Sequence, residues 1–85
     1  MTQTVKSALY IRDAQLFLNE CINTRELVRV LALKADGTPV IYDGWLVTSQ
    51  NFRAGTHKLL NPKNRQVRQI RDVLIFRINN HPVYL

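Results

Sequence analysis

The chain has 85 residues, of which 46% are hydrophobic, and it carries a formal net charge of +6. This length predicts a single domain, residues 1–85, whose small core leaves little room for a deep catalytic pocket, and the apolar content excludes general disorder. The lone cysteine, Cys21, and the absence of any apolar run near the roughly 20 residues of a membrane span predict a soluble cytoplasmic protein with no membrane association.

The first predicted element is a helix over about residues 7–22. Apolar residues recur at positions 14, 17, 18, 21 and 22, which is the spacing of a helix with one buried face. Asp13 is a suitable N-cap, and the pair Asn23-Thr24 ends the pattern. Leu16 lies off the apolar stripe and weakens the assignment. The sequence leaves open whether residues 1–12 are ordered.

Two strands and a tight turn are predicted next. From Leu27 the chain is apolar and β-branched, and Asp36-Gly37 separates this run from the following one, a pattern typical of a β-hairpin. Pro39 cannot donate to a sheet, so the second strand should lie at an edge there or begin at a non-bonded position. Gly44 predicts a bulge or corner within the continuing strand. A polar loop is expected over residues 49–55.

The last third of the chain predicts a further hairpin. Residues 56–60 are expected to form a short strand, Asn61-Pro62 a turn, and residues 66–78 a return strand that ends at Asn79-Asn80. A last strand over residues 82–85 is expected to follow. A competing interpretation is a helix over residues 62–74, with Pro62 as its first residue. The β-rich run over residues 73–78 favours the strand.

Together these elements predict a mostly β (α+β) fold. An N-terminal helix would pack on a small, five-stranded, antiparallel and partly open barrel over about residues 27–85. The barrel would be SH3-like or OB-like, and the order of elements along the chain does not separate the two topologies.

No catalytic or metal-binding constellation is visible. His57 and His81 lie far apart in sequence, and Cys21 falls on the apolar stripe of the helix, where cysteine acts as a small hydrophobe. The acids are scattered, and the glycines form no phosphate-binding loop. We therefore expect a protein that is not an enzyme and that uses no cofactor and no metal.

The positive charge lies entirely in the second half of the chain. Residues 1–43 hold five basic and five acidic side chains, whereas residues 44–85 hold seven basic side chains and one acid, Asp72. Guanidinium and ammonium groups suit phosphates, and exposed aromatic rings stack on bases. We predict a non-enzymatic domain that binds a polyanion, in the first place nucleic acid. The candidate phosphate contacts are Lys63, Arg65, Arg68 and Arg71, helped by Arg53, Lys58 and Arg77, and the candidate stacking residues are Phe52 and Trp45.

The side on which Arg68 lies decides whether this basic surface is one groove. On a strand of period two, Arg65 and Arg71 share a face and Arg68 points to the other, unless a bulge falls between them. The alternative function is a protein–protein interaction or assembly module, such as a homo-oligomer or a domain that meets an acidic protein. A further alternative is that the basic residues bind no partner and form a solvent-exposed face that keeps the protein soluble.

Overall fold

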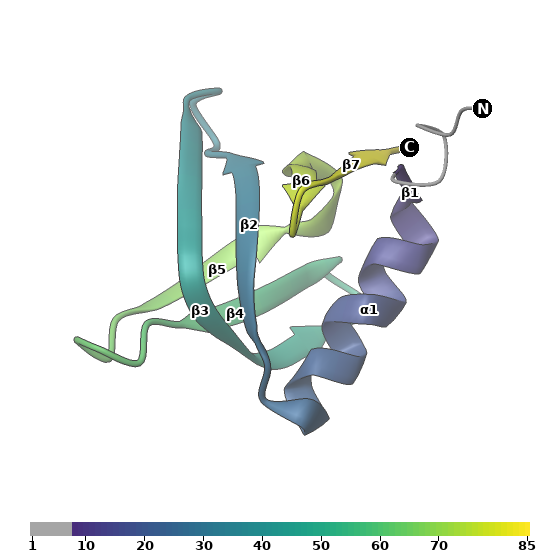
Figure 1. Ribbon diagram of the computed structural model, residues 1–85. Helices are drawn as coiled ribbons and strands as arrows, with labels where there is room; N and C mark the ends of the chain where they lie inside the picture. The colour runs from purple at the N-terminus through teal and green to yellow at the C-terminus, as the bar shows by residue number, and fades with distance from the viewer. Residues whose placement is uncertain (1–7) are drawn as a thin grey trace.

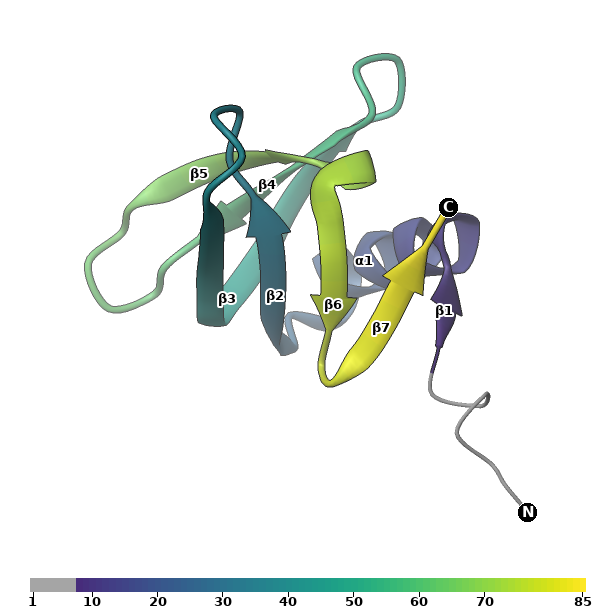
Figure 2. The same ribbon diagram turned by 90° about the horizontal axis from the view of Figure 1, so that it is seen from above.

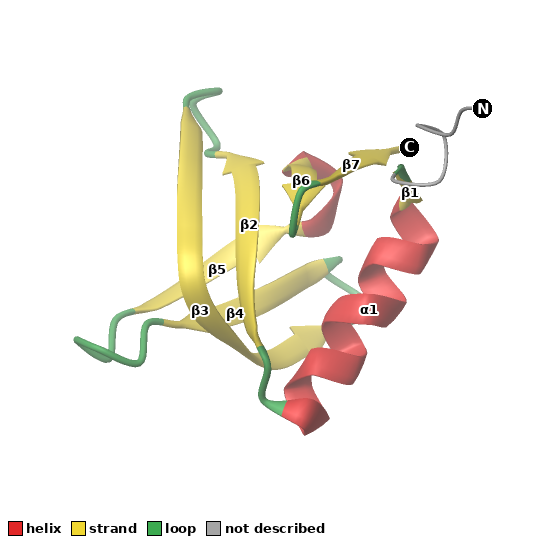
Figure 3. Cartoon of the chain, viewed as in Figure 1, coloured by secondary structure: helices red, strands yellow, loops and turns green. Residues whose placement is uncertain are grey.

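The computed structural model describes residues 8–85 and shows one helix packed against one curved sheet (Figures 1 and 3). In chain order the elements are β1 (Leu9–Tyr10), α1 (Ile11–Thr24), β2 (Leu27–Leu33), β3 (Pro39–Asn51), β4 (Thr56–Leu60), β5 (Val67–Arg71), the 3₁₀ helix η2 (Asp72–Leu74), β6 (Ile75–Ile78) and β7 (His81–Tyr84). The strands of this part of the chain form a single mixed sheet in the order β1-β7-β6-β2-β3-β4-β5.

The sheet is not closed, which corrects the predicted five-stranded barrel. Seven strands are present in the described residues instead of five, and β1 and β5 form the two ends of the sheet. The count rises because β1 was not predicted and because the predicted strand over residues 66–78 is two strands, β5 and β6, whereas β7 corresponds to the predicted last strand. Strands β1 and β7 pair in parallel with each other, while every other pair is antiparallel. The prediction of a mostly β fold with an N-terminal helix is confirmed.

The helix begins later than expected but buries the predicted stripe. Tyr10 occupies the N-cap position and makes no side-chain cap bond, whereas Asp13 lies in the first turn, where its charge suits the helix dipole. Ala14, Leu18 and Cys21 are buried, as the apolar spacing predicts. Residues 8–10 are not helical, and residue 7, where the helix was predicted to begin, lies outside the described residues, as do residues 1–6.

Two glycines set the shape of the β2–β3 hairpin. Gly37 has a φ of 88° in the turn, and the Thr38 amide and hydroxyl donate to the Asp36 carboxylate, which lowers the pKa of Asp36. Gly44 has a φ of 77° at the point where the β2–β3 register shifts, so it is the extra residue of a bulge. Both predictions for these glycines are confirmed.

Strand β3 is long and changes partner halfway along. Its residues 39–46 pair with β2, and its residues 46–51 pair with β4. Each half therefore has one side without a strand partner among the described residues. Pro39 begins the half of β3 that pairs only with β2 among the described residues. It therefore lies at a sheet edge, as predicted. The predicted loop over residues 49–55 is wrong in part, since β3 runs to Asn51.

The predicted return strand over residues 66–78 is broken, which is the largest error in the predicted order of elements. Strand β5 ends at Arg71, η2 turns the chain, and β6 pairs with β2 on the other side of the sheet. The break comes where Asp72 is buried and its amide donates to the Gly55 carbonyl at 2.9 Å. The competing helix over residues 62–74 is also wrong. Asn79 and Asn80 have φ values of 48° and 71° and form the β6–β7 turn.

The core lies between the concave side of the sheet and α1. Its largest fully buried side chains come from the helix, from β2, from β4 and from β6, and include Leu18, Val28, Val30, Leu59 and Ile78. Within residues 8–85, no helix is long and apolar enough to cross a membrane.

Two leucines on α1 test this packing directly. Leu18 is fully buried, whereas Leu16 is 56% exposed on the same helix. We expect Leu18→Ala to lower the free energy of unfolding by about 2–5 kcal/mol, because it leaves a cavity in the core. The matched Leu16→Ala change should stay within about 0.5 kcal/mol. Urea unfolding followed by circular dichroism measures both, and equal losses would contradict the described packing.

Candidate functional site

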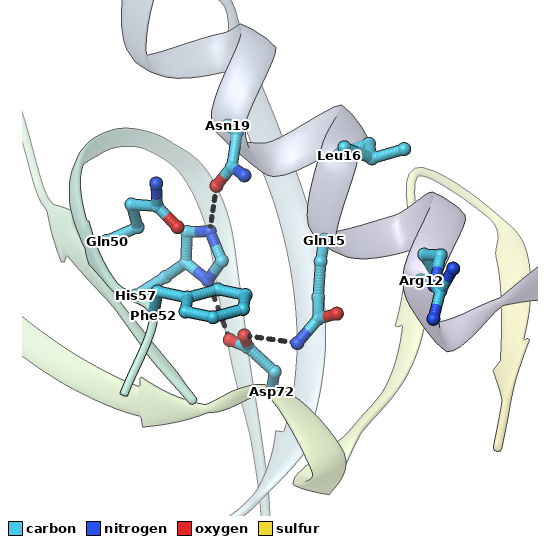
Figure 4. Close-up of a pocket in the computed structure, with 8 residues that line it drawn as sticks. All are labelled: Arg12, Gln15, Leu16, Asn19, Gln50, Phe52, His57 and Asp72. Atoms are coloured by element: carbon cyan, nitrogen blue, oxygen red, sulfur yellow. Dashed lines mark hydrogen bonds and ion pairs between the residues drawn. The ribbon is translucent and has the colours of Figure 1, made fainter. Parts of the chain in front are cut away.

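A recess of about 350 Å³ lies between α1 and the β3–β4 hairpin (Figure 4). We call it the amide pocket, because three of its side chains are amides. Its lining consists of Arg12, Gln15, Leu16 and Asn19 from α1, Gln50 and Phe52 from β3 and the following turn, His57 from β4, and Asp72 from η2. Three segments that are distant in sequence therefore meet at this place.

The floor of the pocket is a buried hydrogen-bonded network. His57 Nδ1 lies 2.6 Å from Asp72 Oδ1, and His57 Nε2 lies 2.7 Å from Asn19 Oδ1. Gln15 Nε2 donates to Asp72 Oδ2 at 2.9 Å. His57 and Asp72 are only 2% and 3% exposed, so both depend on these partners to replace water.

This network joins three elements of the fold. Both nitrogens of His57 face oxygen partners, one on η2 and one on α1. The His57–Asp72 pair therefore fixes α1, β4 and η2 relative to one another and gives the pocket a rigid floor.

The walls of the pocket retain free hydrogen-bonding capacity. The Asn19 amide nitrogen and the Gln15 carbonyl oxygen are left over after each amide has bonded to the floor. Gln50 makes no side-chain hydrogen bond within residues 8–85 and reaches the pocket from the side opposite Gln15 (Figure 4). Donors and acceptors are thus present together, which suits a ligand with an edge that carries both.

An exposed aromatic ring stands at the mouth. Phe52 is 88% exposed at the tip of the β3–β4 hairpin, the highest exposure among the large hydrophobic side chains of the described chain. Its ring forms part of the pocket lining beside His57 (Figure 4). Phe52 therefore presents a π-face without having to leave a packed site.

Basic side chains surround this end of the molecule. Arg12 lines the pocket, Arg53 follows Phe52 in the turn, and Arg71 lies opposite Thr56 at the start of β4. Of the lysines and arginines, only Arg29 forms an ion pair between described residues, with Asp43 at 3.6 Å. The one acid in the pocket lining, Asp72, is already engaged by His57 and Gln15, so these cations are available for an anion.

The predicted basic cluster is divided between the two ends of the β4–β5 pair. Lys63 and Arg65 lie in the loop between β4 and β5, and Phe52 lies in the loop between β3 and β4. These two loops lie at opposite ends of β4 (Figure 2). The β4–β5 register is continuous, so Arg68 and Arg71 point to opposite faces of β5. From Val67 to Arg71 the strand rises about 13 Å, which is more than a Debye length of about 8 Å at physiological salt. The bulge that would have aligned the arginines is absent from β5.

The remaining predicted residues have different environments. Lys58 is exposed on the outer face of β4, beside Ser49 and Gln69 on the neighbouring strands. Arg77 donates to the Asn80 carbonyl at 2.8 Å, at the β6–β7 turn. Neither residue lines the amide pocket.

Trp45 is placed away from the pocket. It is partly buried against the core, and its ring meets Tyr42 edge to face with the centroids 4.9 Å apart. Of the two predicted stacking residues, only Phe52 is therefore free to stack on a ligand.

Cys21 is buried in the core, and burial, followed by the charges of Glu26 and Glu20, raises the pKa of its thiol, which disfavours the reactive thiolate. Between residues 8 and 85, no group of three or more potential ligands could hold a metal ion.

The sequence analysis missed the His57–Asp72 pair and its amide partners. It treated His57 as a lone potential ligand, although Asp72 is the single acid of residues 44–85 and stands among β-forming residues. A charged residue in such a run is a signal that a buried partner exists. Comparison of the chain with protein-family models, with curated proteins and with solved structures finds no match.

The His57–Asp72 pair can be tested against an exposed ion pair of the same chain. We expect Asp72→Ala to lower the free energy of unfolding by about 3–5 kcal/mol, because it leaves His57 buried without its partner. Asp43→Ala removes the partner of Arg29, whose pair is exposed, and should cost less than about 1 kcal/mol. Chemical denaturation measures both variants, and a loss for Asp72→Ala no larger than that for Asp43→Ala would contradict this role.

Proposed function

We propose that the protein binds single-stranded nucleic acid at the amide pocket and is not an enzyme. The observation that carries the proposal is the combination of a highly exposed ring, Phe52, with uncommitted amides and Arg12 in one recess. Each part matches one part of a nucleotide. The ring stacks on a base, the amides bond to the edge of that base, and the arginines contact phosphates.

A base in the pocket would be recognised without strong sequence preference. Stacking on Phe52 is tolerant because every base has a π-face. Gln15 offers an acceptor, Asn19 offers a donor, and Gln50 offers both, so the pocket accommodates more than one pattern of base edge. Phosphates on either side of the base would meet Arg12 and the arginines of the hairpin end.

The fold and location are consistent with this proposal. Strands β2 to β5 follow one another in the sheet, and β6 returns beside β2. We interpret this arrangement as SH3-like rather than OB-like, although the sheet stays open. A cytoplasmic location, proposed from the lone Cys21, would bring the protein into contact with RNA.

A second candidate function is self-assembly through a strand edge. The observation that favours it is the outer edge of β5, which has no strand partner among the described residues. The exposed arginines Arg68 and Arg71 on this strand oppose its pairing with a copy of itself. Light scattering over a concentration series distinguishes the two functions, because assembly predicts a mass that rises with concentration in the absence of nucleic acid.

The stacking role of Phe52 can be tested without disturbing the fold. Because Phe52 is almost fully exposed, Phe52→Ala should leave stability unchanged and weaken binding to single-stranded RNA or DNA by about 1–3 kcal/mol, roughly 5- to 150-fold in Kd. The control is Ile41→Ala, which removes an apolar side chain that is 56% exposed elsewhere on β3. Fluorescence anisotropy measures both, and equal affinities of the two variants would contradict stacking.

Two triple variants with the same net charge test the basic groups. Replacing Arg12, Arg53 and Arg71 by Gln removes charge at the pocket end, and replacing Lys63, Arg65 and Arg68 by Gln removes it at the far end. We expect the first variant to flatten the plot of log K against log salt by about 2, since each lost phosphate contact on a single strand contributes about 0.7. The second variant should keep most of the wild-type slope. Equal slopes would show that only the total charge matters.

A further inference from the structure

Two smaller recesses continue from the amide pocket around β3, β4 and β5. The second, of about 210 Å³, lies on the outer side of these strands and shares Gln50 with the amide pocket. The third, of about 260 Å³, shares Gln69 with the second and reaches the β2–β3 hairpin at Lys34. Gln50 therefore lies between the first and second recesses, and Gln69 lies between the second and third.

The open sheet explains why these recesses are adjacent. Beyond Leu46, β3 has lost β2 as its partner, so Gln50 stands at an unpaired edge. Gln69 stands on β5, the outermost strand at the other side. Between the two edges lie two strand spacings, or about 10 Å. A ligand can thus pass from the helix side over the β3 edge, across the outer face, and over the β5 edge.

Cations line this whole path. Arg12 lies in the first recess and Lys58 in the second, while Lys34 and Arg71 reach the third from two different segments. The single acid on the path is Asp72, which is paired with His57. The second recess is otherwise lined by hydroxyl and amide side chains, which bond to phosphate and sugar oxygens.

We infer that these three recesses form one track for a flexible, single-stranded polynucleotide. This inference rests on the proposed function. One base stacks on Phe52 in the amide pocket, the backbone crosses the outer face at Lys58, and a phosphate further along the strand meets Lys34 and Arg71. The track bends around two strand edges within one small domain, whereas double-stranded DNA stays straight over about 150 base pairs. Single strands should therefore bind and duplexes should not follow the track.

The experiment is a length series with two matched lysine variants. Fluorescein-labelled oligothymidylates and oligouridylates of about 2 to 10 nucleotides, a range around the smallest known single-strand site sizes, are titrated with wild type, Lys34→Gln and Lys63→Gln. We expect wild-type affinity to rise with length and then level off. Lys34→Gln should weaken binding of the longest oligomers about tenfold while leaving that of the shortest unchanged. Lys63→Gln is the same change in the β4–β5 loop, outside the three recesses, and it should have little effect at any length.

The outcomes separate the track from the proposed function. If Lys34→Gln acts equally at all lengths, or no more than Lys63→Gln, the track is wrong, while Phe52-dependent binding of the shortest oligomer still supports the amide pocket. If no oligomer binds at low salt, both proposals fail. Binding of a duplex as tightly as of its separate strands would also overturn the track.

Discussion

The buried contact between His57 and Asp72 is the constraint on which the rest of this structure depends. Asp72 is an acid in a core of small volume, and it is tolerated because His57 and Gln15 bond to its two oxygens. The bond from the Asp72 amide to Gly55 holds the backbone at the same place. The chain must therefore turn away from the direction of β5 at Asp72. Strand β6 then pairs with β2 instead of continuing β5.

The same contact determines where a ligand can bind. With the imidazole held between Asn19 and Asp72, α1 is kept at a fixed distance from the β3–β4 hairpin. The gap that remains is the amide pocket, with Phe52 at its mouth. The buried polar atoms of this network already have hydrogen-bond partners. Only the Asn19 amide nitrogen and the Gln15 carbonyl oxygen therefore remain for a ligand. The rigidity of the floor and the adaptability of the walls thus come from the same side chains.

Sequence reasoning succeeded where a single residue decides the local backbone. Gly37 and Gly44 adopt the positive φ that only glycine reaches without strain, and the Asn79-Asn80 turn uses the next best residues. The stripe on α1 was readable for a similar reason, because its period alone fixes the buried face. These features depend on neighbours in sequence, so sequence alone contained them.

Sequence reasoning failed where contacts between residues far apart in sequence decide the structure. Residues 66–78 read as one β-rich strand, and nothing local interrupts them except Asp72, whose partner is 15 residues away in β4. Strand β1 was invisible because two residues carry no periodicity and gain their pairing from β7. The candidate site was half found. Phe52 and Arg53 stood out as an aromatic beside a cation, but Gln15, Asn19 and Gln50 are ordinary surface residues until the fold brings them together.

Charge density along a sequence is consequently a poor guide to charge density on a surface. Lys63 to Arg71 is the densest basic stretch of the chain, yet a regular strand distributes it over two faces and two ends. Arg12 and Lys34 come from the half whose charges cancel, yet they lie along the path that leads from the amide pocket. What gathers cations here is the incompleteness of the sheet. Two strand edges without a strand partner among the described residues leave recesses that a closed barrel would fill. The basic side chains nearest to those edges give the recesses a positive electrostatic potential.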